Sequence, residues 1–518
     1  MARHVALWML IVALACRAAV AADNDVAFSD ALAALTTTNF KAKEQAASAL
    51  AAIRHPDTRA TLQALLDGRL YYRRDDKQVL IVSEEAPADD LVRISTNNQL
   101  RKTLKTLIAG FDLADSSAQV RLAAVNEMLR SLGEQDAAAL RARQEKETDS
   151  RVRDAIRTGL AIVDLDSEDA NTRLAAVKAL TGSLNSDAYN RLNALLAKRE
   201  PDARVQAAAI DAVKRIESSR SFYGAIETLF FGLSLGSVLV LAAIGLAITF
   251  GVMGVINMAH GELIMLGAYT TYVMQLLMPN HIGASVLVSI PVAFVVAGCV
   301  GILIERGVVR FLYGRPLETL LATFGVSLVL QQIVRDVFTA NNRPVETPAW
   351  MSGSLQFNEA LSITYNRLYV VVFMLIVFSA LLLVLKRTTL GLKVRAVAQN
   401  RAMARAMGVR TQWLDAMTFG LGSGIAGVAG VALSQLTNVG PNLGQSYIID
   451  SFMVVVFGGV GNLWGTLIGG MSLGVVNQLL EPYAGAVLAK IFVLVALILF
   501  IQRRPRGLFP QKGRAAEG

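Results

Sequence analysis

The spacing of hydrophobic and polar residues changes at about residue 222. Between residues 23 and 222, apolar positions recur at i, i+3, i+4 and i+7 within short segments rich in Ala, Leu, Arg, Asp and Glu. This is the pattern of amphipathic helices. After residue 222 the apolar runs lengthen to about 20 residues, enough to cross a bilayer. The pattern predicts an all-α protein: an α-helical repeat domain over 23–222, a polytopic membrane domain over 223–510, and a short tail over 511–518.

The first of these parts contains an internal repeat. Every second unit recurs after 52 or 51 residues, and units of this kind bury their apolar faces by stacking into an α-solenoid. The units resemble HEAT-like repeats, and the segment 71–94 interrupts them as an expected hairpin insertion. The simplest role for the repeated arginines is to solvate a helix surface or to bind a neighbouring Asp. The units begin at Ala118, Ser150, Asn171 and Asp202 and carry Arg121, Arg153, Arg173 and Arg204.

Residues 1–22 have the features of a secretory signal peptide. Arg3 precedes an apolar run from Val5 to Ala15, and small residues precede Asp23. A lipoprotein anchor at Cys16 is the alternative, although Ala13-Leu14-Ala15 fits such a site poorly. Cleavage would leave Cys299 as the single cysteine, so we expect no disulfide in the exported domain.

The second part contains about nine candidate crossings. Its positive charge is concentrated in the segments 305–316, 386–413 and 503–514, which the positive-inside rule assigns to the cytoplasm. An odd number of crossings then predicts an inner-membrane protein with a periplasmic N-terminal domain and a cytoplasmic C-terminus. The crossings are 226–250, 257–279, 284–304, 317–338, 368–386, 413–436, 448–461, 463–480 and 485–502.

Polar residues interrupt the second apolar run, where Asn257, His260, Gly261 and Glu262 lie within six positions. Polar groups inside a membrane are costly and mark functional or structural sites. Zinc catalysis is disfavoured because HGE is not HExxH and the chain has 4 histidines in all. No Gly-Lys dipeptide occurs, so the chain has no P-loop and binds no nucleotide. The net charge of +9 reflects the cytoplasmic segments and not a nucleic-acid surface.

The segment 391–409 is basic and rich in alanine, and its pattern predicts one short helix lying across the membrane face. Two interpretations are open: an ordinary positive-inside loop, or a docking helix for a cytoplasmic partner. The regular alanine spacing favours docking. The residues assigned to this coupling role are Arg395, Ala396, Ala398, Arg401, Ala404 and Gly408.

Three motifs together resemble the LivH-type permeases of branched-chain amino-acid ABC importers. They are the block Asn257–Glu262 followed by Gly267-Ala268-Tyr269, the segment RAVAQNRAMARAMGV (395–409), similar to the coupling loop of ABC permeases, and RRPRGLFP (503–510). Gln399-Asn400 replaces an acidic residue that this loop often carries. The resemblance implies a transport subunit with no cofactor of its own and no enzymatic activity. It also implies four kinds of partner: a second permease subunit, two cytoplasmic ATPases that use ATP, a periplasmic binding protein and the lipid bilayer.

The long exported extension is similar to that of the urea-transporter permeases of the UrtB type, a branch of this family, and it implies urea as the cargo. A branched-chain amino-acid or short-amide permease is the alternative, and a gated channel or membrane sensor is the alternative of another class. The exported domain is expected to receive the binding protein or to brace the complex.

Within the membrane part, Asn257 can donate and accept hydrogen bonds along the pathway. We expect His260 and Glu262 to pair with each other or to cap a helix broken at Gly261. Asp450 is assigned to the outer mouth, Lys490 is expected to extend toward the interface, and Asn462 completes the set of pathway or broken-helix candidates.

Overall fold

The computed structural model describes residues 24–53, 55–82, 90–130, 134–198 and 200–509. The predicted signal peptide and the predicted tail lie outside these ranges. The chain divides into two compact units, unit 1 up to Arg220 and unit 2 from Ser221, and the division falls within helix α10.

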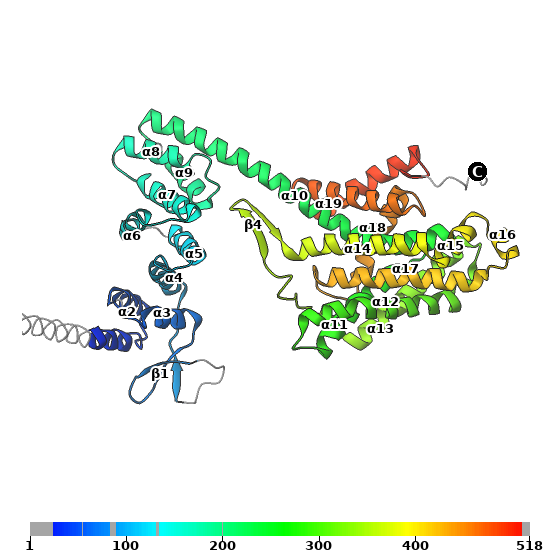
Figure 1. The fold of residues 1–518 in the computed structure, drawn as a ribbon, viewed down its shortest axis with the longest axis horizontal. Coiled ribbons are helices and arrows are strands. Elements are labelled where there is room, and N and C mark those ends of the chain that lie inside the picture. Colours follow the sequence, from blue (N-terminus) through cyan, green and yellow to red (C-terminus); the bar gives the residue numbers. More distant parts are fainter. Residues whose placement is uncertain (1–23, 54, 83–89, 131–133, 199, 510–518) are drawn as a thin grey trace, which may run out of the picture. The chain divides into compact units, whose positions relative to one another are not determined.

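Unit 1 is a succession of short helices, most of which pack against the next along the chain, and several of which pack against the next but one (Figure 1). Its core is formed by leucine, isoleucine, valine and alanine from the inner faces of these helices. The helices are α2 (Phe40–Ile53), α3 (Thr58–Asp67), α4 (Asn98–Asp112), α5 (Ala118–Leu129), α6 (Glu134–Gln144), α7 (Ser150–Asp164), α8 (Ala170–Leu180) and α9 (Ser186–Ala197).

A small antiparallel sheet lies where the sequence predicts a hairpin insertion. Its strands β1 (Leu70–Arg73), β2 (Val79–Ile81) and β3 (Leu91–Arg93) have the order β2-β1-β3. Tyr71 pairs with Leu80 on one side and with Arg93 on the other. The insertion is therefore three-stranded, because the chain after β2 returns to the free edge of β1.

The repeated arginines fall into two classes. Arg121 is buried and binds Glu147, with Nη2···Oε1 at 2.7 Å and Nε···Oε2 at 2.8 Å. Arg173 binds Glu200 in the same way, at 2.6 Å and 3.1 Å. Each also donates from Nη1 to two carbonyls before its own helix. The surface role expected of these two arginines is wrong, because each ties one repeat unit to a glutamate 26 or 27 residues later.

The other two arginines stay at the surface, as expected. Arg204 binds Asp202 at 2.9 Å, and Arg153 donates to the Thr148 carbonyl at 3.3 Å. Asp202 in turn accepts from the backbone N–H groups of Arg204 and Val205 at the start of a helix. These contacts stabilise helix ends, whereas Arg121 and Arg173 join successive repeats.

Unit 2 is built of long apolar helices and one β-hairpin, β4 (Ser354–Asn358) paired with β5 (Leu361–Thr364). Six of the described helices are long and apolar enough to cross a membrane, namely α10, α12, α13, α14, α17 and α19, and α18 is a shorter apolar helix. This confirms the all-α, polytopic membrane fold. The helices are α10 (Ala203–Met253), α11 (His260–Leu277), α12 (Ile282–Gly307), α13 (Pro316–Phe338), α14 (Tyr365–Arg387), α15 (Thr389–Gln399), α16 (Arg401–Ala406), α17 (Thr411–Ser434), α18 (Leu443–Gly458) and α19 (Leu463–Arg503).

Helix α19 contains two passes. A straight helix of 41 residues would be about 60 Å long, yet both of its ends reach the end of α18. Gly465 contacts Gly458 at one end, and Leu508, just after the other end, donates its N–H to the Phe457 carbonyl at 2.9 Å. The chain turns back at Gly485, which has a φ of 78°. The two segments expected at 463–480 and 485–502 are therefore the two arms of α19.

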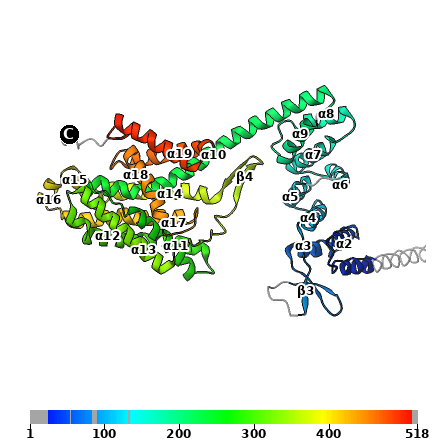
Figure 2. The same cartoon turned by 180° about the vertical axis from the view of Figure 1, so that it is seen from behind.

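The two ends of unit 2 differ in composition. Helices α15 and α16 lie at one end, which we call the basic end, and β4 lies at the other, the hairpin end (Figures 1 and 2). Helix α17 runs between them and is buried along most of its length against α11 and α12. Close approach requires glycine there: a Cβ built at Gly267 would lie 1.9 Å from the Gly427 carbonyl oxygen.

Candidate functional site

The polar motif of the second apolar run lies at a break between two helices. Helix α10 ends at Met253, Gly254 has a φ of 68°, and helix α11 begins at His260. In the nonhelical stretch, the fully buried Asn257 accepts from the Ala259 N–H at 3.0 Å, and the Met258 N–H donates to Thr323 of α13 at 3.1 Å. Irregular backbone at membrane depth is tolerated when it is buried in protein and satisfied by such partners.

His260 and Glu262 bind different helices. His260 Nε2 lies 2.8 Å from the Ala242 carbonyl of α10. Glu262 Oε1 accepts from Ser327 at 3.0 Å and from Gln331 at 2.7 Å, both on α13. The expected His260–Glu262 pair is wrong, because side chains two residues apart in a helix do not face each other. The break also lies before His260 and not at Gly261.

Gly261 has a packing role. It is the second residue of α11, as Gly444 is of α18, and the two glycines touch through their backbones. A Cβ built at Gly261 would lie 2.5 Å from the Gly444 carbonyl oxygen, and one at Gly444 would lie 2.4 Å from that of Gly261. Two helix N-termini thus meet inside unit 2, an arrangement that favours polar or negatively charged groups nearby.

Three buried polar atoms at this junction lack a hydrogen-bond partner among the described residues: Asn257 Nδ2, His260 Nδ1 and Glu262 Oε2. A buried polar group without a partner is unfavourable unless water or a ligand satisfies it. No group of three or more His, Cys, Asp and Glu that could hold a metal occurs in the described parts of the chain. The junction can therefore hold a helix break in shape and offer hydrogen bonds, but it has no metal-ligand set.

Asp450 and Lys490 form an ion pair. Lys490 Nζ lies 3.1 Å from Asp450 Oδ2, joining α18 to the second arm of α19. The sequence led us to expect that Lys490 extends toward the membrane interface. In the structure its ammonium group instead binds the Asp450 carboxylate. Both residues line a cavity of about 390 Å³, here called the polar hollow, which the loop after α17 also borders. No sequence motif joins its four asparagines, because they come from three separate segments: the loop after α13, the loop after α17 and the first arm of α19.

Asn462 lies at the basic end, apart from the other pathway candidates. Its side-chain oxygen accepts from the N–H groups of Trp464 and Gly465, both at 3.1 Å, and thereby caps α19. Its Nδ2 donates to the Phe509 carbonyl at 3.2 Å. Together with Arg395 and Ala398 it lines a cavity of about 380 Å³.

The coupling segment forms two helices where one was expected. Asn400 is extended, with φ −148° and ψ 100°, and its side chain accepts from the Met403 N–H at 2.9 Å to cap α16. Asparagine competes with the helical backbone in this way, so the expected single helix over 391–409 is interrupted. Gly408 ends the segment with a φ of 85°.

Arg401 fastens α16 to α17. Its guanidinium binds both carboxylate oxygens of the fully buried Asp415, with Nη1···Oδ1 at 3.2 Å. It also lies over the Tyr313 ring, 5.0 Å from the centroid. Within the coupling segment, Ala404 is buried, whereas Arg395 and Ala396 are exposed. Bidentate binding to a buried carboxylate thus links α16 to the N-terminal part of α17.

The outer face of the coupling segment is both apolar and basic. Met407 is 79% exposed and Met403 is 60% exposed, an unusual position for such side chains. Beside them, Arg306, Arg405 and Arg410 border a cavity of about 570 Å³. Sequence reasoning included the alanines of this segment but missed the methionines, whose recurrence at i and i+4 was a usable signal.

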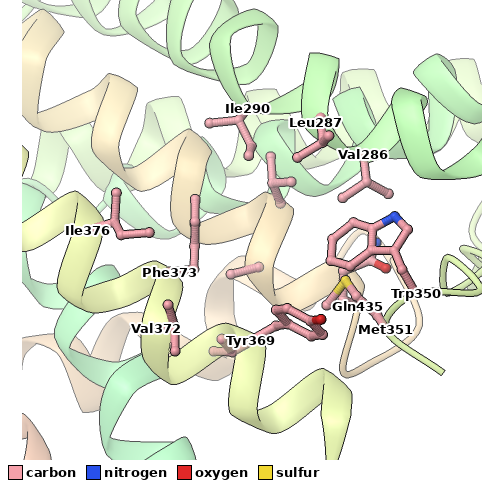
Figure 3. Close-up of a pocket in the computed structure, with 13 residues that line it drawn as sticks. Val286, Leu287, Ile290, Trp350, Met351, Tyr369, Val372, Phe373, Ile376 and Gln435 are labelled. Atoms are coloured by element: carbon pink, nitrogen blue, oxygen red, sulfur yellow. The ribbon is translucent and has the colours of Figure 1, made fainter. Parts of the chain in front are cut away.

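A further cavity, of about 240 Å³, is almost entirely apolar. It lies among α12, α14 and the end of α17, with Trp350 at one end and Ile376 at the other (Figure 3). Gln435 brings one of its few polar groups. A polar ligand would find few hydrogen bonds there, whereas the lining of the polar hollow offers many.

Comparison with known proteins places unit 2 in a family. Residues 228–501 match the family model described as "Branched-chain amino acid transport system / permease component". The chain is 32% identical over 301 residues to the high-affinity branched-chain amino acid transport system permease protein LivH of Salmonella typhimurium, covering 56% of this chain and 97% of the relative. BraD of Pseudomonas aeruginosa, with the same description, is 29% identical, covering 55% and 96%. The ribose import permease protein RbsC of Escherichia coli is 26% identical, covering 53% and 85%.

No solved structure matches the chain. The matched region begins within α10 and ends within α19, so it contains both the helix break at 254–259 and the coupling segment. The chain therefore belongs to the family of permease components of branched-chain amino acid transport systems, and it is a transport subunit and not an enzyme.

Proposed function

We propose that this chain is a permease subunit of an ATP-driven ABC importer for urea, and that it forms half of the translocation pathway. The observation that carries the proposal is the coupling segment: an exposed surface of methionines and arginines, fastened to the buried helix α17 by Arg401 and Asp415. Its partners are a second permease subunit, two cytoplasmic ATPases and a periplasmic binding protein. This chain itself binds no ATP.

The contacts of α17 support a route from the ATPases to the pathway. When nucleotide binding moves the ATPases, the coupling segment moves with them and displaces the first turn of α17 through the Arg401–Asp415 pair. Helix α17 packs against α10 at Gly422 and against α11 at Gly427. Closely packed helices transmit such a displacement because there is no space to absorb it. The helix break at 254–259 is where α11 can then tilt relative to α10.

The orientation follows from charge. We place the basic end in the cytoplasm and the hairpin end, with unit 1, in the periplasm of a bacterial inner-membrane protein. In this arrangement unit 1 receives the binding protein or braces the complex. Deletion of residues 23–222 behind the signal peptide is expected to impair uptake, and normal uptake by a well-expressed truncation would contradict this role.

The choice of urea rests on the exported helical extension and on the polar hollow, whose two charged residues pair with each other and leave no net charge. The relatives named for branched-chain amino acids favour leucine, isoleucine or valine as the alternative cargo. Uptake of radiolabelled urea and leucine at micromolar concentration, in cells with and without the gene, separates the two. Loss of ATP-dependent urea uptake alone supports the proposal, and loss of leucine uptake alone supports the alternative. Flux that persists after ATP depletion would indicate a channel.

A further inference from the structure

The polar hollow is assembled from segments far apart in the sequence. Both arms of α19 contribute to it, as do the first half of α18, the loops after α13 and α17, and two leucines of α10. Thirteen residues line it, and the polar ones are Asn342, Thr437, Asn438, Asn442, Ser446, Tyr447, Asp450, Asn477 and Lys490. Its volume of about 390 Å³ is within the range of small-molecule sites.

Its lining is polar without net charge. Asp450 and Lys490 are its charged residues, and they neutralise each other across 3.1 Å. Arg335, which lies outside the lining, donates to Asn442 Oδ1 at 2.8 Å and holds that amide at the rim. The Asp450 side chain is 12% exposed and that of Lys490 is 50% exposed. Removing Lys490 would therefore leave the largely buried Asp450 carboxylate without compensation.

Four carboxamides distinguish this lining from the other cavities. Each presents a carbonyl oxygen that accepts and an NH₂ group that donates two hydrogen bonds. Among the described residues, the amides of Asn438 and Asn477 have no hydrogen-bond partner, so their groups are free to bind a ligand. A small uncharged amide carries the complementary carbonyl and NH₂ groups.

We propose that the polar hollow is the outer recognition site of the pathway for a small uncharged amide, and that the Asp450–Lys490 pair sets its selectivity by keeping the site electrically neutral. This inference rests on the proposed function, because urea is the simplest such amide. It adds a location and a selectivity rule: the site accepts hydrogen-bonding groups and disfavours an ion of the same shape.

The test uses guanidinium, a cation with the planar shape and the NH₂ groups of urea. The complete importer, with its binding protein, is reconstituted in liposomes, and inhibition of ATP-driven urea uptake by guanidinium is measured. The variants are Lys490→Met, which leaves the Asp450 carboxylate unpaired, and Lys490→Met/Asp450→Asn, which restores neutrality. Because the binding protein is the same in every sample, a difference between variants reports the permease. Lys386→Met removes the same charge at the other end of unit 2 and is the matched control.

Guanidinium is expected to inhibit Lys490→Met at least tenfold more strongly than the wild type, whereas the double variant and Lys386→Met respond as the wild type does. If the ion pair had only a structural role, the double variant would differ from the wild type as Lys490→Met does, because it also lacks the pair. If Lys490→Met does not assemble, Asn477→Asp adds a negative charge while keeping the pair, and the same increase in inhibition is expected.

Equal inhibition of all assembled variants, with normal urea uptake by the wild type, would overturn the recognition site and leave the proposed function standing. Absence of ATP-driven urea uptake by the wild type would overturn both. A second set of variants tests the amides: Asn477→Leu is expected to lower urea uptake at least fivefold and Asn477→Gln to retain most of it. Asn366→Leu, outside the hollow, is the control, and equal uptake by Asn477→Leu and Asn366→Leu would also overturn the recognition site.

Discussion

Weakening the contact between Arg401 and Asp415 is expected to uncouple transport from ATP hydrolysis. Replacing Arg401 by lysine keeps the positive charge but loses the bidentate geometry and the stacking on Tyr313. The ATPases should still bind and hydrolyse ATP, because the exposed methionines and arginines of the segment are unchanged. Helix α17 should no longer follow them reliably, so uptake should fall more than ATP hydrolysis.

The magnitude follows from burial. Asp415 is fully buried and Arg401 is about one-third exposed. Removing one partner of a fully buried pair costs about 3–5 kcal/mol, and the partial exposure of Arg401 together with the charge that lysine keeps lowers this to about 2 kcal/mol. A change of about 2 kcal/mol corresponds to about a thirtyfold shift in the equilibrium between attached and detached α16.

The assay measures ATP hydrolysis and cargo uptake on the same proteoliposomes and compares their ratio. We expect Arg401→Lys to raise the ATP hydrolysed per molecule transported by about tenfold or more. Asp415→Asn should act in the same direction, and the double variant should show less than the sum of the two effects, as expected for residues in contact. Arg367→Lys, at the start of α14 and away from both Asp415 and the coupling segment, is the control. An unchanged ratio in Arg401→Lys would refute the coupling route through α17.

Four further predictions concern stability and local structure. Arg121→Met removes one of the two arginines that bind the buried Glu147, the other being Arg143, and should destabilise unit 1, seen as faster hydrogen exchange in α5 and α7, whereas Arg153→Met at the surface should change exchange far less. The hydrogen bonds from Arg121 hold the pKa of Glu147 well below its ordinary value. The contribution of Glu147 to the stability of unit 1 is therefore complete above about pH 4.3 and is lost as the pH falls toward the pKa of the folded state. Acid unfolding that is the same with and without Arg121 would contradict this. The side-chain contact with Arg204 lowers the pKa of Asp202 to about 2, so the stabilisation of the start of α10 is lost as the pH falls from about 4 to about 2. The protection of its amide hydrogens, measured relative to their intrinsic exchange rates, should fall over this range in the wild type and less so in Asp202→Ala. Gly261→Val should prevent the approach of α11 to α18 and abolish assembly or uptake in a detergent-stability and uptake assay, while Gly224→Val, which has open space around it, should be tolerated.

The coarse fold was predictable because local composition reports the solvent around each segment. The period of 3.6 residues in 23–222 and the long apolar runs after 222 are set by whether a residue faces water, protein or lipid, and this can be read residue by residue. For the same reason the two arms of α19 were predicted as separate segments. The polar block 257–262 was also identified correctly as unusual, since polar groups are costly at that depth whatever their partners are.

What only the tertiary structure decided is which distant groups meet. Glu262 binds residues of α13 more than 60 positions away, Arg401 binds Asp415, and Asp450 binds Lys490 across 40 residues. The amides of the polar hollow come from separate loops and helices, so no local pattern announces them. The physical reason is that the sequence of a helix does not specify which neighbouring helix each of its faces will contact. Packing in the folded protein decides which residues of that face meet a partner. The sequence by itself determined the elements and their environment, and the packing of glycine-rich helices around α17 decided which polar groups became partners.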